Sequence, residues 1–221
     1  MVHRLIRQGR RRRWWLEIIG WWRSAFPGYL LARYRGGPVL QLTRHHVTAF
    51  LDPGRGQFVE QLRRTWDPGM ARQIAAHLTL VYPEEIPDAA ELAARAALAA
   101  ARTPPFTIAV GSPVYGDSPA DGVFLRVDDV DGGIRAFRAV AVAAAGALGF
   151  PPHITIVHPR TSRRGGQAWA ELASTRIDAC FTITEVAITA FNGDRWPVLQ
   201  VLPLTGNQPR PDRTHLESEP P

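Results

Sequence analysis

The heptapeptide HLTLVYP at residues 77–83 recurs as HITIVHP at residues 153–159, with four of the seven positions identical. In an extended strand, residues two apart point to the same face. Each copy therefore presents a His and a Thr together and turns its Leu or Ile side chains the other way. A core strand gains nothing from such a pair. Two imidazoles and two hydroxyls brought together from two strands supply an acid, a base and two hydrogen-bond donors, a set suited to phosphoryl chemistry without a metal.

The elements expected around the two copies correspond to each other. Hydrophobic periodicity, turn residues and Pro or Gly stops predict the first half of the domain as a strand at 47–51, a helix at 57–66, the first copy as a strand, and an Ala-rich helix from Asp88 to about 102. The second half is predicted as strands at 106–110 and 122–127 around the loop 111–121, a helix at 133–148, the second copy, a short helix at about 167–172, and closing strands at 180–191 and 196–203 around the turn 192–194.

Each copy thus follows a helix and precedes another, which predicts two similar α+β halves within one domain. If the halves pack about an approximate twofold axis, the two His-Thr faces meet across a central groove. We therefore expect an α+β, bilobal fold with two pseudo-symmetric lobes whose antiparallel sheets line that groove.

The composition fits one domain with extensions at both ends. The chain has 221 residues, of which 45% are hydrophobic. We predict an N-terminal arm at 1–44, a catalytic domain at 45–205 and a Pro-rich, charged and disordered tail at 206–221. The single cysteine, Cys180, excludes an internal disulfide framework and a Cys-rich zinc site, and its apolar surroundings predict a buried side chain.

The net charge of +6 misleads about the domain. Residues 1–44 hold ten Arg against the single acid Glu17, which leaves 16 Arg against 19 acidic residues, a net charge of −3, for the rest of the chain. The part that carries the motifs is slightly acidic. It therefore has to hold a phosphate by local donors and not by a general basic surface.

The arm contains the run Arg10–Arg13 followed by a Trp-rich amphipathic helix pattern. Charges and Pro27 interrupt its apolar stretch, which argues against a secretory signal and a membrane span. A helix on a membrane surface or on RNA remains an alternative. We favour a helix docked on the domain, or an upstream stretch included by a misassigned start codon.

A third His-x-Thr, at His46 and Thr48, opens the first strand. Its continuation does not match the other two copies beyond the aliphatic character of the strand. We therefore assign His46 and Thr48 to structure, because a lone His on an amphipathic strand is more often structural than catalytic.

Paired His-x-Thr-x motifs, one in each half of an α+β domain of this size, resemble the 2H phosphoesterase superfamily and, more narrowly, its 2'-5' RNA ligase-like branch. The resemblance covers roughly residues 46–204. It implies a bilobal fold and substrates that are RNA 2',3'-cyclic phosphates, 2'-5' linkages or small cyclic nucleotides, with no metal or cofactor.

The resemblance also implies roles for four catalytic residues. His153 is expected to act as general base on the attacking water and His77 as general acid on the departing ribose oxygen. Thr79 and Thr155 are expected to donate to the non-bridging oxygens. Ligation in place of hydrolysis would exchange the roles of the two imidazoles.

The chain departs from the family pattern at one position. Many members carry an Arg five residues after the second His, where this chain has His158, and Arg160 follows two residues later. Arg160, His158 and Tyr82, which occupies the corresponding position in the first copy, are candidates to bind substrate at the edge of the groove. Phe124 and Tyr115 are candidates to stack on a base.

The leading hypothesis is a cytoplasmic, monomeric, metal-independent cyclic phosphodiesterase acting on RNA ends or nucleotides. The alternatives are 2'-5' RNA end joining and a non-catalytic RNA or nucleotide binder. A metal-dependent hydrolase is disfavoured because no His-x-His, His-Glu-x-x-His or carboxylate cluster adjoins the motifs.

Overall fold

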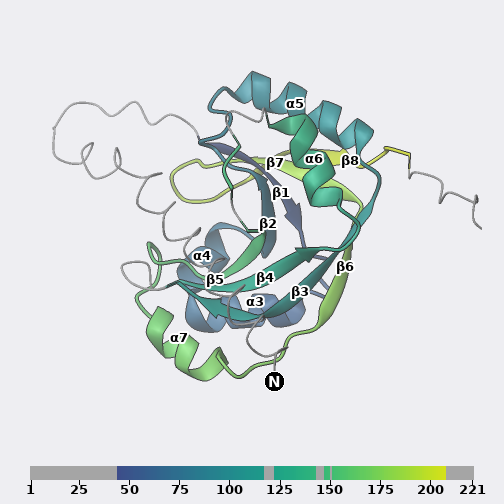
Figure 1. Cartoon of the computed structure of the whole chain (residues 1–221). Helices are drawn as coiled ribbons and strands as arrows, with labels where there is room; N and C mark the ends of the chain where they lie inside the picture. Colours follow the sequence, from purple (N-terminus) through teal and green to yellow (C-terminus); the bar gives the residue numbers. More distant parts are fainter. Residues whose placement is uncertain (1–43, 117–121, 143–146, 150, 208–221) are drawn as a thin grey trace, which may run out of the picture.

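The computed structural model describes residues 44–116, 122–142, 147–149 and 151–207 (Figure 1). The predicted arm helix, the tip of the loop 111–121 and the tail beyond residue 207 lie outside these residues. In the described part of the chain, no helix combines the length and the apolar character that crossing a membrane requires.

Eight strands form one antiparallel, curled sheet. The strands are β1 (His45–Phe50), β2 (His77–Val81), β3 (Phe106–Tyr115), β4 (Val123–Asp129), β5 (His153–Val157), β6 (Ala179–Ile183), β7 (Glu185–Ala190) and β8 (Val198–Pro203). Their order is β6-β3-β4-β5-β2-β1-β7-β8, so the two motif strands, β5 and β2, are neighbours at the centre. The expected α+β fold with two similar lobes is confirmed, with four strands on each side of the β5–β2 boundary. The strands β7 and β8, which the sequence placed in the second half, lie beside β1 of the first half.

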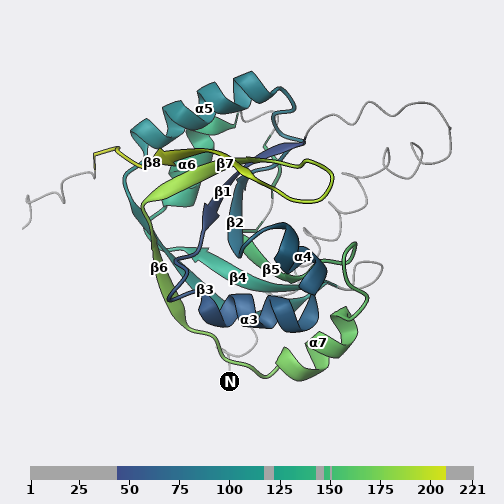
Figure 2. The same ribbon diagram turned by 180° about the vertical axis from the view of Figure 1, so that it is seen from behind.

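Helices cover the face of the sheet that carries the aliphatic residues of the motifs. They are α3 (Gln57–Trp66), α4 (Pro68–Gln73), α5 (Ala89–Arg102), α6 (Gly133–Ala141) and α7 (Gly165–Leu172). Figure 1 shows α5 and α6 at one end of the molecule and α3, α4 and α7 at the other, and the reverse view in Figure 2 shows the same division. The helices are exchanged between the halves, because α3 packs on β5 and α6 packs on β2.

The core lies between these helices and the sheet. Leu78, Leu80, Ile154 and Ile156 are at most 1% exposed and belong to one hydrophobic cluster with residues of α3, α5 and α6. The alternation of these aliphatic residues with the motif His and Thr fixes the register. A slip of one residue would turn the His and Thr side chains into the core.

The curl explains one wrong prediction, the single strand at 180–191. The chain there forms β6, which pairs with β3 at one edge of the strand order, and β7, which pairs with β1 and β8 near the other edge. Only Thr184 separates the two strands, and its carbonyl accepts a hydrogen bond from the Leu204 N–H at 2.9 Å. The two edges of the sheet therefore come close together, and the chain passes from one to the other without a loop (Figure 1).

The helix predicted at 133–148 is also too long, since α6 ends at Ala141. Val142 takes an extended conformation and is 4% exposed in the core, so packing overrides the helical propensity of the Ala-rich segment. Beyond it, the Leu148 carbonyl accepts from Arg138 at 2.9 Å and the Leu148 N–H donates to Glu85 at 2.7 Å.

Smaller differences concern α4, which was not predicted, and the turn at 192–194. That turn is part of a longer loop between β7 and β8, in which Gly193 has a φ of 100°. The prediction of a buried Cys180 is wrong. The side chain is exposed because strand alternation turns it away from the core, whereas its neighbour Phe181 is 2% exposed.

Candidate active site

The two motif strands run side by side and bring the four predicted catalytic residues together. Leu78 of β2 pairs with Ile154 of β5 in an antiparallel register. One step to either side, the same register places His77 beside Thr155 and Thr79 beside His153. All four of these side chains are half-buried, on the face of the sheet opposite the aliphatic residues.

Each motif imidazole is anchored in the same way. His77 Nδ1 lies 2.7 Å from the carbonyl oxygen of Ala75, and His153 Nδ1 lies 3.0 Å from that of Pro151. A carbonyl oxygen only accepts hydrogen bonds, so Nδ1 carries the proton in both rings. Nε2 is then the basic nitrogen of each neutral ring, and both halves of the domain present an Nε2 for chemistry.

Two residues of α3 fix the segment that leads into His77. Arg63 donates to the Ile74 carbonyl at 2.8 Å and forms an ion pair with Glu60 at 3.3 Å. Glu60 in turn accepts a hydrogen bond from the Ala76 N–H. Sequence reasoning missed both residues, because an Arg and a Glu three positions apart resemble an exposed helix pair, whereas the Arg63 side chain is 1% exposed.

The surroundings of the two imidazoles favour their neutral forms. Loss of hydration, the positive charge of Arg63 and, to a smaller extent, His153 together lower the pKa of His77 to about 3, although the hydrogen bond to the Ala75 carbonyl acts in the opposite direction. Loss of hydration also lowers the pKa of His153. Both rings are therefore neutral near pH 7 in the free protein.

The candidate substrate-binding residues His158 and Arg160 lie on the loop after β5. His158 Nδ1 accepts a hydrogen bond from the Arg160 N–H at 3.1 Å, and the Arg160 side chain is exposed. Loss of hydration lowers the pKa of His158, and the charges of Arg160 and His153 lower it further. His158 therefore lies within electrostatic range of the motif imidazoles, as expected for a residue at the edge of the site.

Asp67, between α3 and α4, holds this loop in place. Its carboxylate accepts from the His158 N–H at 2.9 Å, from the Thr161 hydroxyl at 2.5 Å and from the Met70 N–H at 2.9 Å. The residue is fully buried. No sequence signal linked Asp67 to a loop about 90 positions later.

The other candidate contact residues are less open to a ligand than the sequence suggested. Phe124 is 2% exposed and packs edge-on against His153, with 5.1 Å between ring centroids. Tyr115 stacks on Trp169 at 5.6 Å, which occupies one face of its ring. Tyr82 is half-buried directly after β2, where burial raises the pKa of its hydroxyl.

The third His-x-Thr lies on the same face of the sheet as the motif His and Thr residues, with Thr48 opposite Thr79. Thr48 donates to the Leu78 carbonyl at 2.9 Å, a structural contact. The His46 ring lies 5.6 Å from that of His77 and 4.2 Å from that of Trp196, measured between centroids. The pairing of β1 with β2 brings His46 close to His77, and the sequence of the third His-x-Thr alone does not indicate this.

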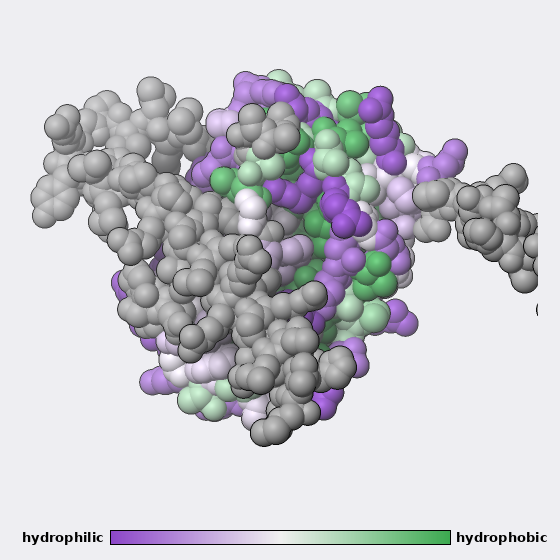
Figure 3. Space-filling view, viewed as in Figure 1, coloured by the Kyte–Doolittle hydropathy of each residue, from purple (hydrophilic) through white to green (hydrophobic). Residues whose placement is uncertain are grey.

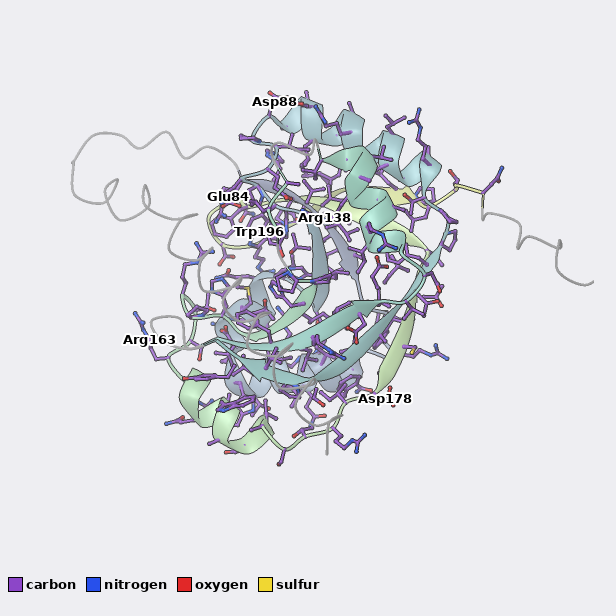
Figure 4. All side chains as sticks on the ribbon, viewed as in Figure 1. Glu84, Asp88, Arg138, Arg163, Asp178 and Trp196 are labelled. Carbon is purple, nitrogen blue, oxygen red and sulfur yellow. The ribbon has the colours of Figure 1, made fainter. Side chains whose placement is uncertain are left out.

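Two residues before His46, Arg44 forms an ion pair with Glu84 at 2.6 Å. Figure 4 shows Glu84 and Trp196 on the same side of the molecule. In Figure 3 the described surface mixes hydrophilic and apolar residues.

Within the described ranges, no three His, Cys, Asp or Glu side chains gather in a way that suits a metal ion.

Comparison with known proteins identifies the family. The sequence matches the profile of the 2'-5' RNA ligase superfamily over residues 51–195, more than half of the chain. The chain belongs to this superfamily. The resemblance that the paired motifs indicated is thereby confirmed, and membership in the superfamily supports a phosphoesterase or ligase activity. A search of curated proteins found no match.

Solved structures show the same superfamily fold. Escherichia coli LigT complexed with NADP+ is 20% identical, with a TM-score of 0.52 over 74% of this chain and 98% of LigT. LigT complexed with phosphate gives the same values. The protein TT0787 of Thermus thermophilus is 18% identical, with a TM-score of 0.51 over 75% of this chain and all of that protein.

Proposed function

We propose that this protein is a metal-independent cyclic phosphodiesterase that hydrolyses 2',3'-cyclic phosphates of RNA ends or nucleotides. The observation that carries the proposal is the pair of imidazoles on adjacent strands, each with its Nδ1–H directed to a backbone carbonyl and each next to a motif Thr. This arrangement supplies two nitrogens that take and give protons on the same phosphate, together with two hydroxyl donors.

In the proposed hydrolysis, His153 Nε2 takes a proton from a water molecule as its oxygen bonds to phosphorus. The bond from phosphorus to the 2' or 3' oxygen breaks, and His77 Nε2–H gives its proton to that oxygen. The product is a phosphomonoester beside a free hydroxyl. Thr79 and Thr155 donate to the non-bridging oxygens, whose charge increases as phosphorus becomes five-coordinate.

The acid role requires a protonated His77, although its pKa is about 3 in the free protein. A bound phosphate places negative charge next to Nε2 and raises this pKa, because an opposite charge within a few Å favours the protonated form. Substrate binding is therefore coupled to proton uptake, and turnover has a bell-shaped dependence on pH.

A second candidate function is 2'-5' RNA end joining, which the name of the superfamily favours. A 5'-hydroxyl would replace water as the nucleophile and would form a 2'-5' phosphodiester when the cyclic phosphate opens. The same imidazoles and hydroxyls would serve both reactions.

One experiment tests both candidates. The protein is incubated in EDTA with 2',3'-cyclic nucleotides, and separately with RNA fragments that carry a 2',3'-cyclic phosphate or a 5'-hydroxyl. Hydrolysis to phosphomonoesters supports the first proposal, and a joined RNA with a 2'-5' linkage supports the second. Binding of the RNA without either product would contradict both and favour a non-catalytic binder.

A further inference from the structure

His46 is a buried polar residue whose Nε2 forms no hydrogen bond with the described residues. The residue is 5% exposed, and its Nε2 has no hydrogen-bond partner among the described residues. Directly opposite on β7 lies Thr189, which is fully buried and whose Oγ1 also has no partner there. Two adjacent buried polar groups without partners are costly to a fold and call for a functional explanation.

The position of His46 points to His77. The two rings meet edge to face, at 84° between planes, and the Trp196 ring also contacts His46, with 4.2 Å between centroids. Both motif imidazoles have a phenyl ring edge-on beside them, Phe50 at 6.2 Å from His77 and Phe124 at 5.1 Å from His153, measured between centroids. His46 therefore adds an imidazole to the aromatic contact that His77 already makes with a phenyl ring.

The positive charge that His77 has to carry as a general acid explains why a neutral imidazole at position 46 is useful. Arg63 on α3 and His153 on β5 both disfavour a positive charge on His77, whereas a general acid has to carry one. Burial and the neighbouring charges of His77, Arg44 and His45 hold the pKa of His46 well below its usual value, so His46 stays neutral. A neutral imidazole keeps one nitrogen with a lone pair, the negative end of its dipole.

We propose that His46 is a positioning residue for His77, supplying this uncharged nitrogen beside the imidazolium that His77 forms during turnover. The inference rests on the proposed function for its role in catalysis, but its effect on the protonation of His77 is measurable without turnover. Thr189 completes the polar surroundings of His46 on the side away from His77.

The test compares His46→Phe with His46→Gln and with the matched control His45→Phe. Phe keeps a ring against Trp196 and His77 without a nitrogen, and replacing an unpaired buried nitrogen by an apolar group does not by itself destabilise the fold. Gln keeps an uncharged acceptor. His45 is the adjacent residue on β1, and strand alternation places it on the opposite face. If His46→Phe does not fold, His46→Leu takes its place.

The proton NMR signal of the His77 ring is titrated in each folded variant, both in the free protein and with inorganic phosphate. In His46→Phe we expect the pKa of His77 to fall by about one unit, which is a tenfold loss of its protonated form. His46→Gln and His45→Phe should stay near the wild type. With 2',3'-cyclic AMP, kcat of His46→Phe should fall about tenfold at an unchanged KM.

The two proposals fail in different ways. Absence of turnover in the wild-type protein would contradict the proposed function and leave the titration to decide the role of His46. A pKa of His77 in His46→Phe equal to that of the wild type, with or without phosphate, would overturn the positioning role whatever the turnover.

Discussion

Two single hydrogen bonds, from His77 to the Ala75 carbonyl and from His153 to the Pro151 carbonyl, determine which nitrogen of each ring is basic. The sequence predicts both imidazoles and both Thr side chains through the repeated heptapeptide. It does not predict these backbone acceptors, since any residue supplies a carbonyl and only the folded geometry selects one. The sequence also does not predict the proposed role of His46, because that role depends on a neighbouring strand and not on the motif that contains His46.

The motif hydroxyls should matter for turnover and not for stability. Thr79→Val and Thr155→Val each keep the size and branching of the side chain but remove a donor to the transition-state oxygens. We expect each change to lower kcat for 2',3'-cyclic AMP by roughly 100- to 1000-fold, the usual effect of losing one such donor. Steady-state kinetics measure this effect.

Thr48→Val is the matched control. It removes a buried hydroxyl that bonds the Leu78 carbonyl, which should cost about 1 kcal/mol of unfolding free energy while kcat stays near that of the wild type. Equal losses of kcat in all three variants would show that the motif hydroxyls act only through the fold.

The histidines should make the protein less stable in mild acid. Burial lowers the pKa of four residues, His46, His77, His153 and His158. An unfolded His has a pKa of about 6.5, so below that pH the unfolded chain binds more protons than the folded one. The contribution of these histidines to the free energy of unfolding is therefore complete above about pH 6.5. It decreases as the pH falls toward about 3, the pKa of folded His77.

Urea unfolding at pH values of about 7.5, 6.5 and 5.5 checks this sign in a range where most carboxylates remain ionised. A progressive loss of stability from the highest to the lowest pH is expected. Constant or rising stability over that range would mean that the imidazoles are not held neutral by their surroundings.

At the scale of elements, hydrophobic pattern and stop signals suffice where an element is local. The predicted helix at 57–66 is confirmed. The helix that begins after Asp88 is also confirmed, and Asp88 caps it by accepting from the Glu91 N–H at 2.7 Å. These sequence signals fail where packing between distant segments determines the structure. Val142 leaves its helix to enter the core, and the segment 180–191 divides at Thr184 because the sheet curls.

Asp67 links α3 and α4 to the loop after β5 through hydrogen bonds to its carboxylate. Asp67→Ala would remove the acceptor of the Met70 and His158 N–H groups, whereas the Thr161 hydroxyl would keep only its longer hydrogen bond to the His158 carbonyl. We expect the free energy of unfolding to drop by roughly 2 to 4 kcal/mol, because buried donors without partners are costly. Denaturant unfolding gives the value.

Asp52→Ala serves as the comparison. The exposed Asp52 side chain accepts only from the Arg55 N–H among the side-chain hydrogen bonds of the described residues, so its loss should cost less than about 1 kcal/mol. Similar losses for the two variants would show that Asp67 does not hold the loop.

At the scale of the whole molecule, the two halves meet at the pair β2–β5, and this arrangement places one motif imidazole from each half on the same face. The sequence predicts this meeting through the symmetry of its elements. It does not predict that all eight strands form a single curled sheet, since strand order depends on contacts between distant segments.

The net positive charge of the chain lies in residues 1–44, so it should influence long RNA more than small substrates. Deletion of residues 1–43 keeps Arg44 and its ion pair with Glu84. We expect turnover of 2',3'-cyclic AMP within about twofold of the full chain, but weaker and less salt-dependent binding of RNA, because fewer counterions are released. Kinetics and binding at two salt concentrations compare the two forms, and a large loss of mononucleotide turnover would contradict this division of roles.

The central claim is that His77 and His153 together perform acid and base catalysis on a cyclic phosphate. The most direct measurement is the rate of 2',3'-cyclic AMP hydrolysis in EDTA by the wild type, His77→Ala, His153→Ala and the double variant. We expect each single variant to lose at least about 1000-fold in kcat and the double variant to lose little more, because the two residues act as a unit. Full activity in either single variant would contradict the account.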